Sequence, residues 1–156
     1  MIALQHIHPM IVHFPIVFFL TLVAFDAIAV IRGVNVTGRT ATGNISAGLA
    51  ALAAIAALVA AGFGDLALDI AKSHGLQSDY AQAHAVLGVI TALTLVAWAV
   101  VRGLLWRRDI RPAGASVAAV PMVETIIAGL VVLTAYFGGV LVFELGVNVN
   151  RAVGGG

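Results

Sequence analysis

The sequence contains no cysteine, and this absence excludes several kinds of chemistry. Without thiols the chain forms no disulfide, holds no iron–sulfur cluster through the usual thiolates and has no C-x-x-C-H motif for covalent haem attachment. It also lacks a P-loop, a G-x-G-x-x-G fingerprint after a strand and a serine in a G-x-S-x-G setting. Phosphate-cradling, dinucleotide-binding and serine-nucleophile chemistry are therefore not indicated.

Charged residues are scarce as well. They make up 10% of the 156 residues, and 62% are hydrophobic, whereas soluble globular domains are roughly 25% charged. This composition predicts an integral membrane protein in the lipid bilayer. A net charge of +1 gives no basic surface for nucleic acid, so that class of partner is excluded. No basic residue precedes residue 32 and the first apolar run has spanning length, which argues against a cleaved secretory signal.

Four long apolar segments account for nearly the whole chain. We place the spans at about residues 9–31, 44–66, 82–105 and 123–147, each long enough to cross a bilayer as a helix. The predicted fold is an all-α, up-down bundle of four transmembrane helices in one domain, residues 1–147, with a short frayed tail at 148–156. The second span is rich in Ala and Gly, which predicts tight helix packing. A polar connection with room for a short surface helix is expected at 65–81.

The basic residues predict the orientation. Cytoplasmic loops of membrane proteins carry the excess of Lys and Arg. The connections after the first and third spans hold six arginines, whereas the other side holds Lys72 and Arg151. The six arginines are Arg32, Arg39, Arg102, Arg107, Arg108 and Arg111. We therefore predict a protein of the bacterial inner membrane with both termini outside the cell.

Asp26 lies within the first span. It is expected to form a structural ion pair with Arg32 or Arg102.

Three of the five histidines and two of the four prolines fall within residues 6–15. Pro9 suits the first position of a helix, with His8 as its cap, which puts His13 about one turn inside. Pro15 is expected to bend the helix and free a backbone carbonyl, which a membrane tolerates only where neighbours or water satisfy it. An ionisable ring beside a broken backbone ladder predicts a site rather than an anchor.

His13 and His84 are the leading ligand pair. They enter the membrane from the same predicted side on parallel helices, so they can face each other across the bundle and occupy both axial positions of haem b. His8 competes with His13, but five residues turn it about 140° away on a regular helix. Gly138 and Gly139 would leave room for the porphyrin.

Two other hypotheses remain open at this point. His13 and His84 with Asp65 and Glu144 would form a mixed imidazole and carboxylate site for zinc, iron or manganese. Alternatively the chain has no chemistry of its own and is a non-catalytic accessory subunit that scaffolds a larger membrane complex. In that case the histidines would be interface residues. His6 and His74 are otherwise interpreted as solvated.

Several motifs carry a resemblance to a known family. Residues 8–15 (HPMIVHFP), Gly64-Asp65, Ala83-His84-Ala85 and residues 136–147 (YFGGVLVFELGV) resemble the hallmarks of the bacterial membrane family catalogued as domain of unknown function 2231. The resemblance covers nearly the whole chain and implies a four-helix membrane protein. It supports His8, His13, Asp65, His84, Gly138 and Gly139 as motif positions without assigning their roles. Relatives often have a histidine near the end of the last motif, where this chain has Glu144.

Some relatives are fused to Rieske-type or c-type cytochrome domains, and this context implies electron transfer. The sequence therefore predicts a small electron carrier or subunit rather than a stand-alone enzyme. It would bind haem b near the periplasmic face and exchange electrons with a periplasmic cytochrome, a Rieske-type protein or a quinone.

Overall fold

The computed structural model describes residues 7–147, which form helices joined by short connections. No strand occurs within that range, and four helical segments are long and apolar enough to cross a membrane. The predicted all-α architecture with four spans is thereby confirmed. The first span is divided into α1 and α2. The elements are α1 (Ile7–Ile11), α2 (His13–Ile31), α3 (Ala41–Ser73), α4 (Asp79–Arg107), the 3-10 turn η2 (Gly114–Ala118) and α5 (Ala119–Phe143).

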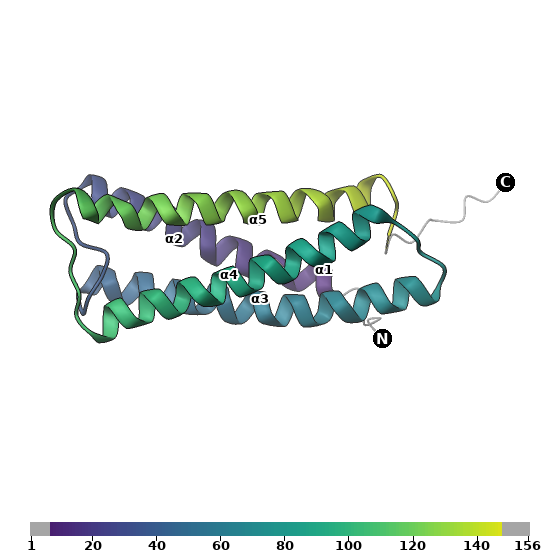
Figure 1. The fold of residues 1–156 in the computed structure, drawn as a ribbon, viewed down its shortest axis with the longest axis horizontal. Helices are drawn as coiled ribbons and strands as arrows, with labels where there is room; N and C mark the ends of the chain where they lie inside the picture. Colours follow the sequence, from purple (N-terminus) through teal and green to yellow (C-terminus); the bar gives the residue numbers. More distant parts are fainter. Residues whose placement is uncertain (1–6, 148–156) are drawn as a thin grey trace.

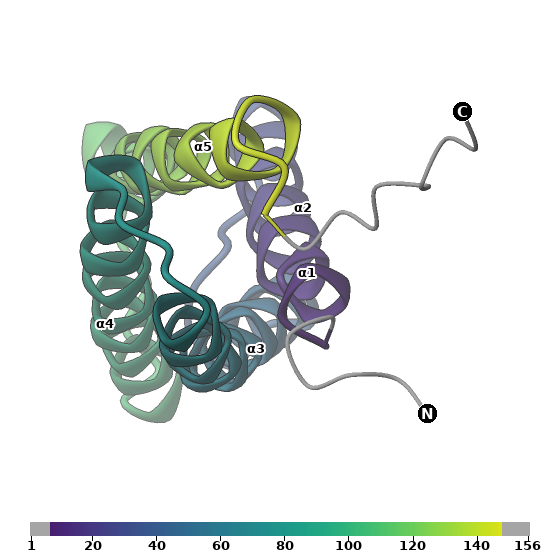
Figure 2. The same cartoon turned by 90° about the vertical axis from the view of Figure 1, so that its right-hand side faces the viewer.

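The four long helices form an up-down bundle (Figure 1). Viewed along the bundle, α2, α3, α4 and α5 follow one another around a square, and α5 closes it against α2 (Figure 2). Consequently α2 lies diagonally opposite α4, and α3 lies diagonally opposite α5. Side chains from the first and third spans must therefore meet across the core rather than along a shared helix interface.

The bundle has two chemically different ends. The histidine end comprises α1, the α3–α4 connection at residues 74–78 and the end of α5. The arginine end comprises the connections 32–40 and 108–118. Among residues 7–147, Lys72 lies near the histidine end, and the six arginines of the first and third connections cluster at the other end. Arg151 lies outside the described residues. The placement of both termini outside the cell stays a prediction from this asymmetry.

The first span is interrupted at Val12, between α1 and α2. The helix begins at Ile7, so His8 lies within α1 and is not the predicted cap ahead of Pro9. The Val12 amide still donates to the carbonyl of His8, at 3.1 Å. Pro15 has no amide hydrogen for the carbonyl of Ile11, which explains why regular helix geometry is lost just there.

The second span is longer than predicted. α3 continues to Ser73 without a break, so residues 65–73 are helix and not part of a polar connection. Nothing in this stretch breaks a helix before Gly75, whose φ of +90° suits glycine. The amide of Leu76 then donates to the carbonyl of Ala71, which ends α3 in a Schellman pattern. The side chain of Ser78 caps the start of α4.

An apolar core fills the middle of the bundle. It combines Phe19 and Leu22 with alanines of α3 and with residues of α4 and α5. The prediction of tight packing holds for one face of α3, where Ala53 is fully buried. It is wrong for Gly48 and Gly62, where an added Cβ would meet nothing within 4 Å. A spanning helix at the corner of a four-helix square keeps its remaining surface for lipid.

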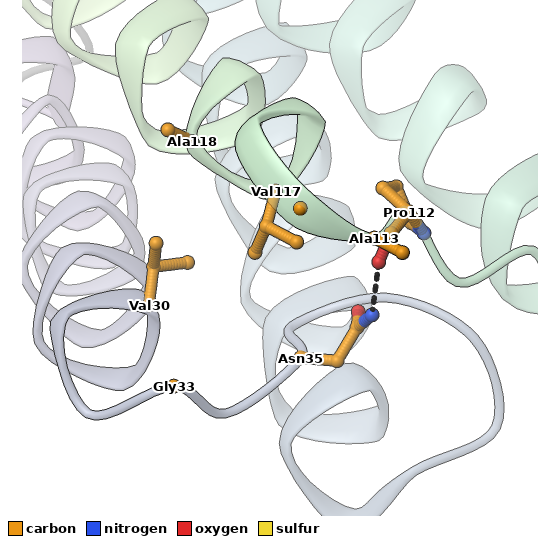
Figure 3. A pocket seen from close by; sticks show the side chains of 8 residues that line it. Val30, Gly33, Asn35, Pro112, Ala113, Val117 and Ala118 are labelled. Carbon is orange, nitrogen blue, oxygen red and sulfur yellow. Dashed lines mark hydrogen bonds between the residues drawn. The ribbon is translucent and has the colours of Figure 1, made fainter.

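The two connections at the arginine end are tied together. Asp109, at a φ of +52°, accepts the Arg39 amide at 2.7 Å and binds the Arg111 guanidinium at 2.9 Å. The Arg39 amide and the Arg111 guanidinium hold the pKa of Asp109 below its usual value. Nearby, Asn35 donates to the carbonyl of Pro112 at 2.9 Å beside a small pocket whose lining contains no titratable side chain (Figure 3).

Candidate functional site

At the histidine end, the imidazole rings of His8 and His84 meet across the core. Their centroids lie 6.0 Å apart and their planes are inclined by 70°. His8 comes from α1 and His84 from α4, so the two rings bridge the diagonal of the bundle. Both rings are only partly buried. The prediction that histidines of the first and third spans face each other is thus realised by His8, and not by His13.

Each ring is oriented by a backbone carbonyl of a further helix, which is α3 for His8 and α5 for His84. Nδ1 of His8 lies 2.9 Å from the carbonyl oxygen of Ala60 in α3, and Nδ1 of His84 lies 3.0 Å from that of Thr134 in α5. A carbonyl oxygen only accepts hydrogen bonds, so each Nδ1 carries the hydrogen and donates it. In a neutral ring the lone pair then resides on Nε2.

Each ring also lies against a glycine placed one turn beyond that carbonyl. A Cβ added to Gly64 would lie 3.0 Å from Cε1 of His8, and a Cβ added to Gly138 would lie 2.9 Å from Cε1 of His84. The structure thus uses Gly138 to admit an imidazole, not to leave open space for a porphyrin as predicted. A Cβ added to Gly139 would lie 4.0 Å from Cδ2 of Phe143, so this second glycine faces a phenyl ring at ordinary contact distance and no imidazole.

The pair shows a repeated local design. In both α3 and α5 a backbone carbonyl and the glycine four residues later lie on the same face of the helix. An imidazole from a different helix packs against that face in each case. No hydrogen bond within residues 7–147 involves Nε2 of His8 or His84. Histidines that bind metals usually have this arrangement, in which one ring nitrogen donates to a carbonyl or carboxylate and the other is left for the metal.

The other predicted ligands lie elsewhere. His13 is exposed on the outer surface of α2, because the break at Val12 and the helical rotation turn it away from the core. Asp65 and Glu144 are exposed too. Within residues 7–147, no three His, Asp or Glu side chains lie close enough to share a metal ion. The mixed set of His13, His84, Asp65 and Glu144 is therefore not assembled in this structure.

The two remaining histidines do not join the pair. His74 is exposed at the end of α3, where its Nδ1 lies 2.7 Å from the carbonyl of Ile70. His6 lies outside the described residues.

A second polar group lies in the core toward the arginine end. Nη2 of Arg102 lies 2.8 Å from Oδ2 of Asp26, which confirms the predicted pairing across the α2–α4 diagonal. Ser46 of α3 donates to the same carboxylate at 2.5 Å. Glu124 of α5 lies 3.8 Å from Nη1 of Arg102 and accepts from Nε1 of Trp98 at 3.1 Å. All four long helices thus contribute to this group, which we call the acid–arginine cluster (Asp26, Ser46, Trp98, Arg102 and Glu124).

Sequence reasoning missed Glu124, Ser46 and Trp98. Glu124 was placed at the start of the fourth span, where a carboxylate is unremarkable, yet it is completely buried. One signal was available on α4: His84, Thr91 and Trp98 are spaced seven residues apart and Arg102 follows four later. Residues at this spacing lie on the face of a helix that packs into the core of a bundle. The spacing therefore predicts a row of polar side chains on α4 that faces the other helices.

Comparisons with known proteins agree with the motifs of the sequence. No curated protein and no solved structure matches the chain. The sequence profile of the family described as "Predicted membrane protein (DUF2231)" matches residues 5–151, nearly the whole chain. The matched range includes both histidines of the pair and the acid–arginine cluster. The protein therefore belongs to the DUF2231 family of predicted membrane proteins.

Proposed function

We propose that this protein is a small electron carrier of the bacterial inner membrane that binds haem b through His8 and His84. The observation that carries the proposal is the pair itself: two imidazoles oriented by backbone carbonyls and opposed across the bundle diagonal. The ligand set differs from the sequence prediction in one residue, because His8 replaces His13.

The number of ligands favours haem over a mixed metal site. Structural zinc sites use four protein ligands and catalytic ones usually three, whereas the described residues bring only two metal-binding side chains together. Haem needs no more than two axial ligands from the protein, since the porphyrin supplies the other donors.

The two rings lie close together, with centroids 6.0 Å apart. Nε2 of each ring would be the atom that holds the iron, because each Nδ1 donates to a carbonyl. When bound, haem would supply one-electron transfer at its iron. The carbonyls of Ala60 and Thr134 would fix the tautomer and orientation of the two ligands.

The position of the pair suits exchange with an external partner. His8 and His84 are only partly buried and lie at one end of the bundle. If that end faces the periplasm, as the arginine distribution predicts, the partner would be a periplasmic cytochrome, a Rieske-type protein or a quinone.

A second candidate is a single non-haem metal ion held between the same two rings. It is favoured by the short distance of 6.0 Å between the ring centroids and by the close contact of the rings with Gly64 and Gly138. Zinc, iron or manganese would then need solvent or a partner protein to complete the coordination.

The test is a reduced-minus-oxidised visible spectrum of the full chain, expressed with ample haem and purified in detergent. We expect a low-spin haem spectrum that His8→Ala and His84→Ala each abolish. His13→Ala and His74→Ala are the matched controls and should retain it. If the protein shows no Soret band but contains stoichiometric metal, the haem proposal is wrong and the non-haem metal site takes its place. If it contains neither haem nor metal, both proposals are wrong and the scaffold hypothesis is left.

A further inference from the structure

The acid–arginine cluster contains more negative than positive charge. Asp26 and Glu124 are 0% exposed and Arg102 is 2% exposed. With both carboxyl groups ionised, the three side chains would carry a net charge of −1 in the interior of a membrane-spanning bundle. An uncompensated buried charge is costly, and such a group becomes neutral rather than stay ionised without a partner.

The surrounding elements provide no compensating cation. The hydroxyl of Ser46 on α3 bonds to Asp26, and the indole of Trp98 on α4 bonds to Glu124. The connection after α2 contributes the carbonyl of Val36, which accepts from Arg102 at 2.8 Å. These groups are neutral, so Asp26 on α2, Arg102 on α4 and Glu124 on α5 are the charges to be balanced.

Three buried atoms of the cluster have no hydrogen-bond partner within the described residues: Oδ2 of Asp26, Oε2 of Glu124 and Nη1 of Arg102. Oδ2 of Asp26 has Nη2 of Arg102 2.8 Å away as an ion-pair partner. Glu124 is less well compensated, because its Oε2 has no hydrogen bond within the described residues and its Oε1 lies 3.8 Å from Nη1 of Arg102.

We infer that the acid–arginine cluster is a proton-binding site and that Glu124 carries the proton. A proton added to the Glu124 carboxylate gives a neutral acid, and the cluster then consists of one carboxylate, one guanidinium and no net charge. The proton is bound at Oε2 of Glu124, which has no hydrogen-bond partner within the described residues, while Oε1 keeps its bond from Trp98. Asp26 stays ionised because it has the closer guanidinium and the hydroxyl of Ser46.

A metal cation fits this cluster less well than a proton. The guanidinium of Arg102 lies 2.8 Å from Asp26 and 3.8 Å from Glu124, and its positive charge repels a second cation at either acid. The inference is independent of the haem proposal, since none of these side chains contacts His8 or His84 and the apolar core separates the two groups.

The test is infrared spectroscopy of the full chain in detergent at neutral pH. A protonated carboxylic acid has a carbonyl stretch that carboxylates lack, and this band shifts to lower frequency in D2O when the proton exchanges. We expect one such band in the wild-type protein, its shift in D2O, and its loss in Glu124→Gln. Glu144→Gln, which changes an exposed glutamate, should keep the band.

Thermal unfolding provides a second measurement. Glutamine has the shape of the neutral acid, so Glu124→Gln should fold and melt close to the wild-type temperature. The inference is wrong if the wild-type band is absent, if it persists in Glu124→Gln, or if Glu124→Gln fails to fold. A band that never shifts in D2O would also contradict it, because a bound proton that cannot exchange is a structural feature and not a site.

Discussion

His84 lies directly against Gly138, and a Cβ at that position would come within 2.9 Å of the imidazole Cε1. The same relationship joins His8 to Gly64, at 3.0 Å. A Cβ essentially never comes as close as 2.9 Å, and a 3.0 Å contact is tighter than nearly all observed ones. Each ring is also fixed by a hydrogen bond to a carbonyl one turn away, which limits how far it can move. The histidine pair in this arrangement therefore favours glycine at both positions.

Gly138→Ala should displace the His84 ring. Alanine normally stabilises a helix interior by roughly 0.5–1 kcal/mol relative to glycine, but here the overpacking should destabilise the protein by about 1–3 kcal/mol. The change should also weaken the proposed haem binding. Thermal unfolding in detergent and haem occupancy are the measurements. The matched control is Gly129→Ala on the same helix, where a Cβ meets nothing within 4 Å. Equal losses of stability and haem occupancy in the two variants would contradict the contact between His84 and Gly138.

The buried face of α3 should be sensitive to size. Ala53 is 0% exposed in the apolar core, so Ala53→Leu should cost about 1–3 kcal/mol through overpacking. Gly48→Leu adds an even larger group on the same helix, but into open space, and it should leave the stability unchanged or raise it. Melting curves of the two variants in the same detergent decide. If Gly48→Leu is the more damaging variant, the rotation of α3 described here is wrong.

Arg102→Leu should be among the most damaging substitutions. It removes the counter-ion of Asp26 and breaks a buried ion pair, for which losses of about 3–5 kcal/mol are typical. Arg108→Leu removes an exposed arginine at the same end and serves as the control. Adding Asp26→Asn to Arg102→Leu should restore part of the stability, since it removes the unpaired carboxylate. No rescue would mean that packing, rather than charge, explains the loss.

Asp109 should make the arginine end sensitive to acid. Its pKa is lowered in the folded protein by the Arg39 amide and the Arg111 side chain. A lowered pKa stabilises the fold above the unfolded value, usually 3.8, and this contribution is lost as the pH falls through the folded value. Asp109→Asn should therefore melt below the wild type at neutral pH, and the difference should vanish in acid. Asparagine tolerates the positive φ of this position. Asp69→Asn, at an exposed position, is the control.

The predicted orientation is tested by single cysteines in a chain that has none. Gln77→Cys lies in the connection at the histidine end, and Ser116→Cys lies in η2 at the arginine end. Both side chains are exposed. A membrane-impermeant thiol reagent applied to intact cells should label Gln77→Cys alone. Labelling of Ser116→Cys alone would reverse the orientation and put the histidine pair on the cytoplasmic side.

The sequence by itself determined the four spanning helices and limited the partners of Asp26. An apolar run of about twenty residues crosses a bilayer as a helix, because every backbone polar group must be hydrogen-bonded within the segment. A charge within a span needs a counter-ion, and the sequence left Arg32 and Arg102 as the alternatives for Asp26; the structure shows Arg102. The family resemblance followed from motifs that an ordinary spanning helix has no reason to contain.

The tertiary structure alone decided which side chains meet. The rotation of each helix sets the direction of a side chain, and one residue changes it by about 100°. The break at Val12 therefore determines that His8 and not His13 reaches His84. Likewise, Glu124 reaches Arg102 only because α5 packs against α2 and α4. Its charge is then added to the Asp26–Arg102 pair, which is neutral without it. Helix rotation, local breaks and long-range packing are not encoded in the length or composition of a span, which is why these contacts could not be predicted from the sequence.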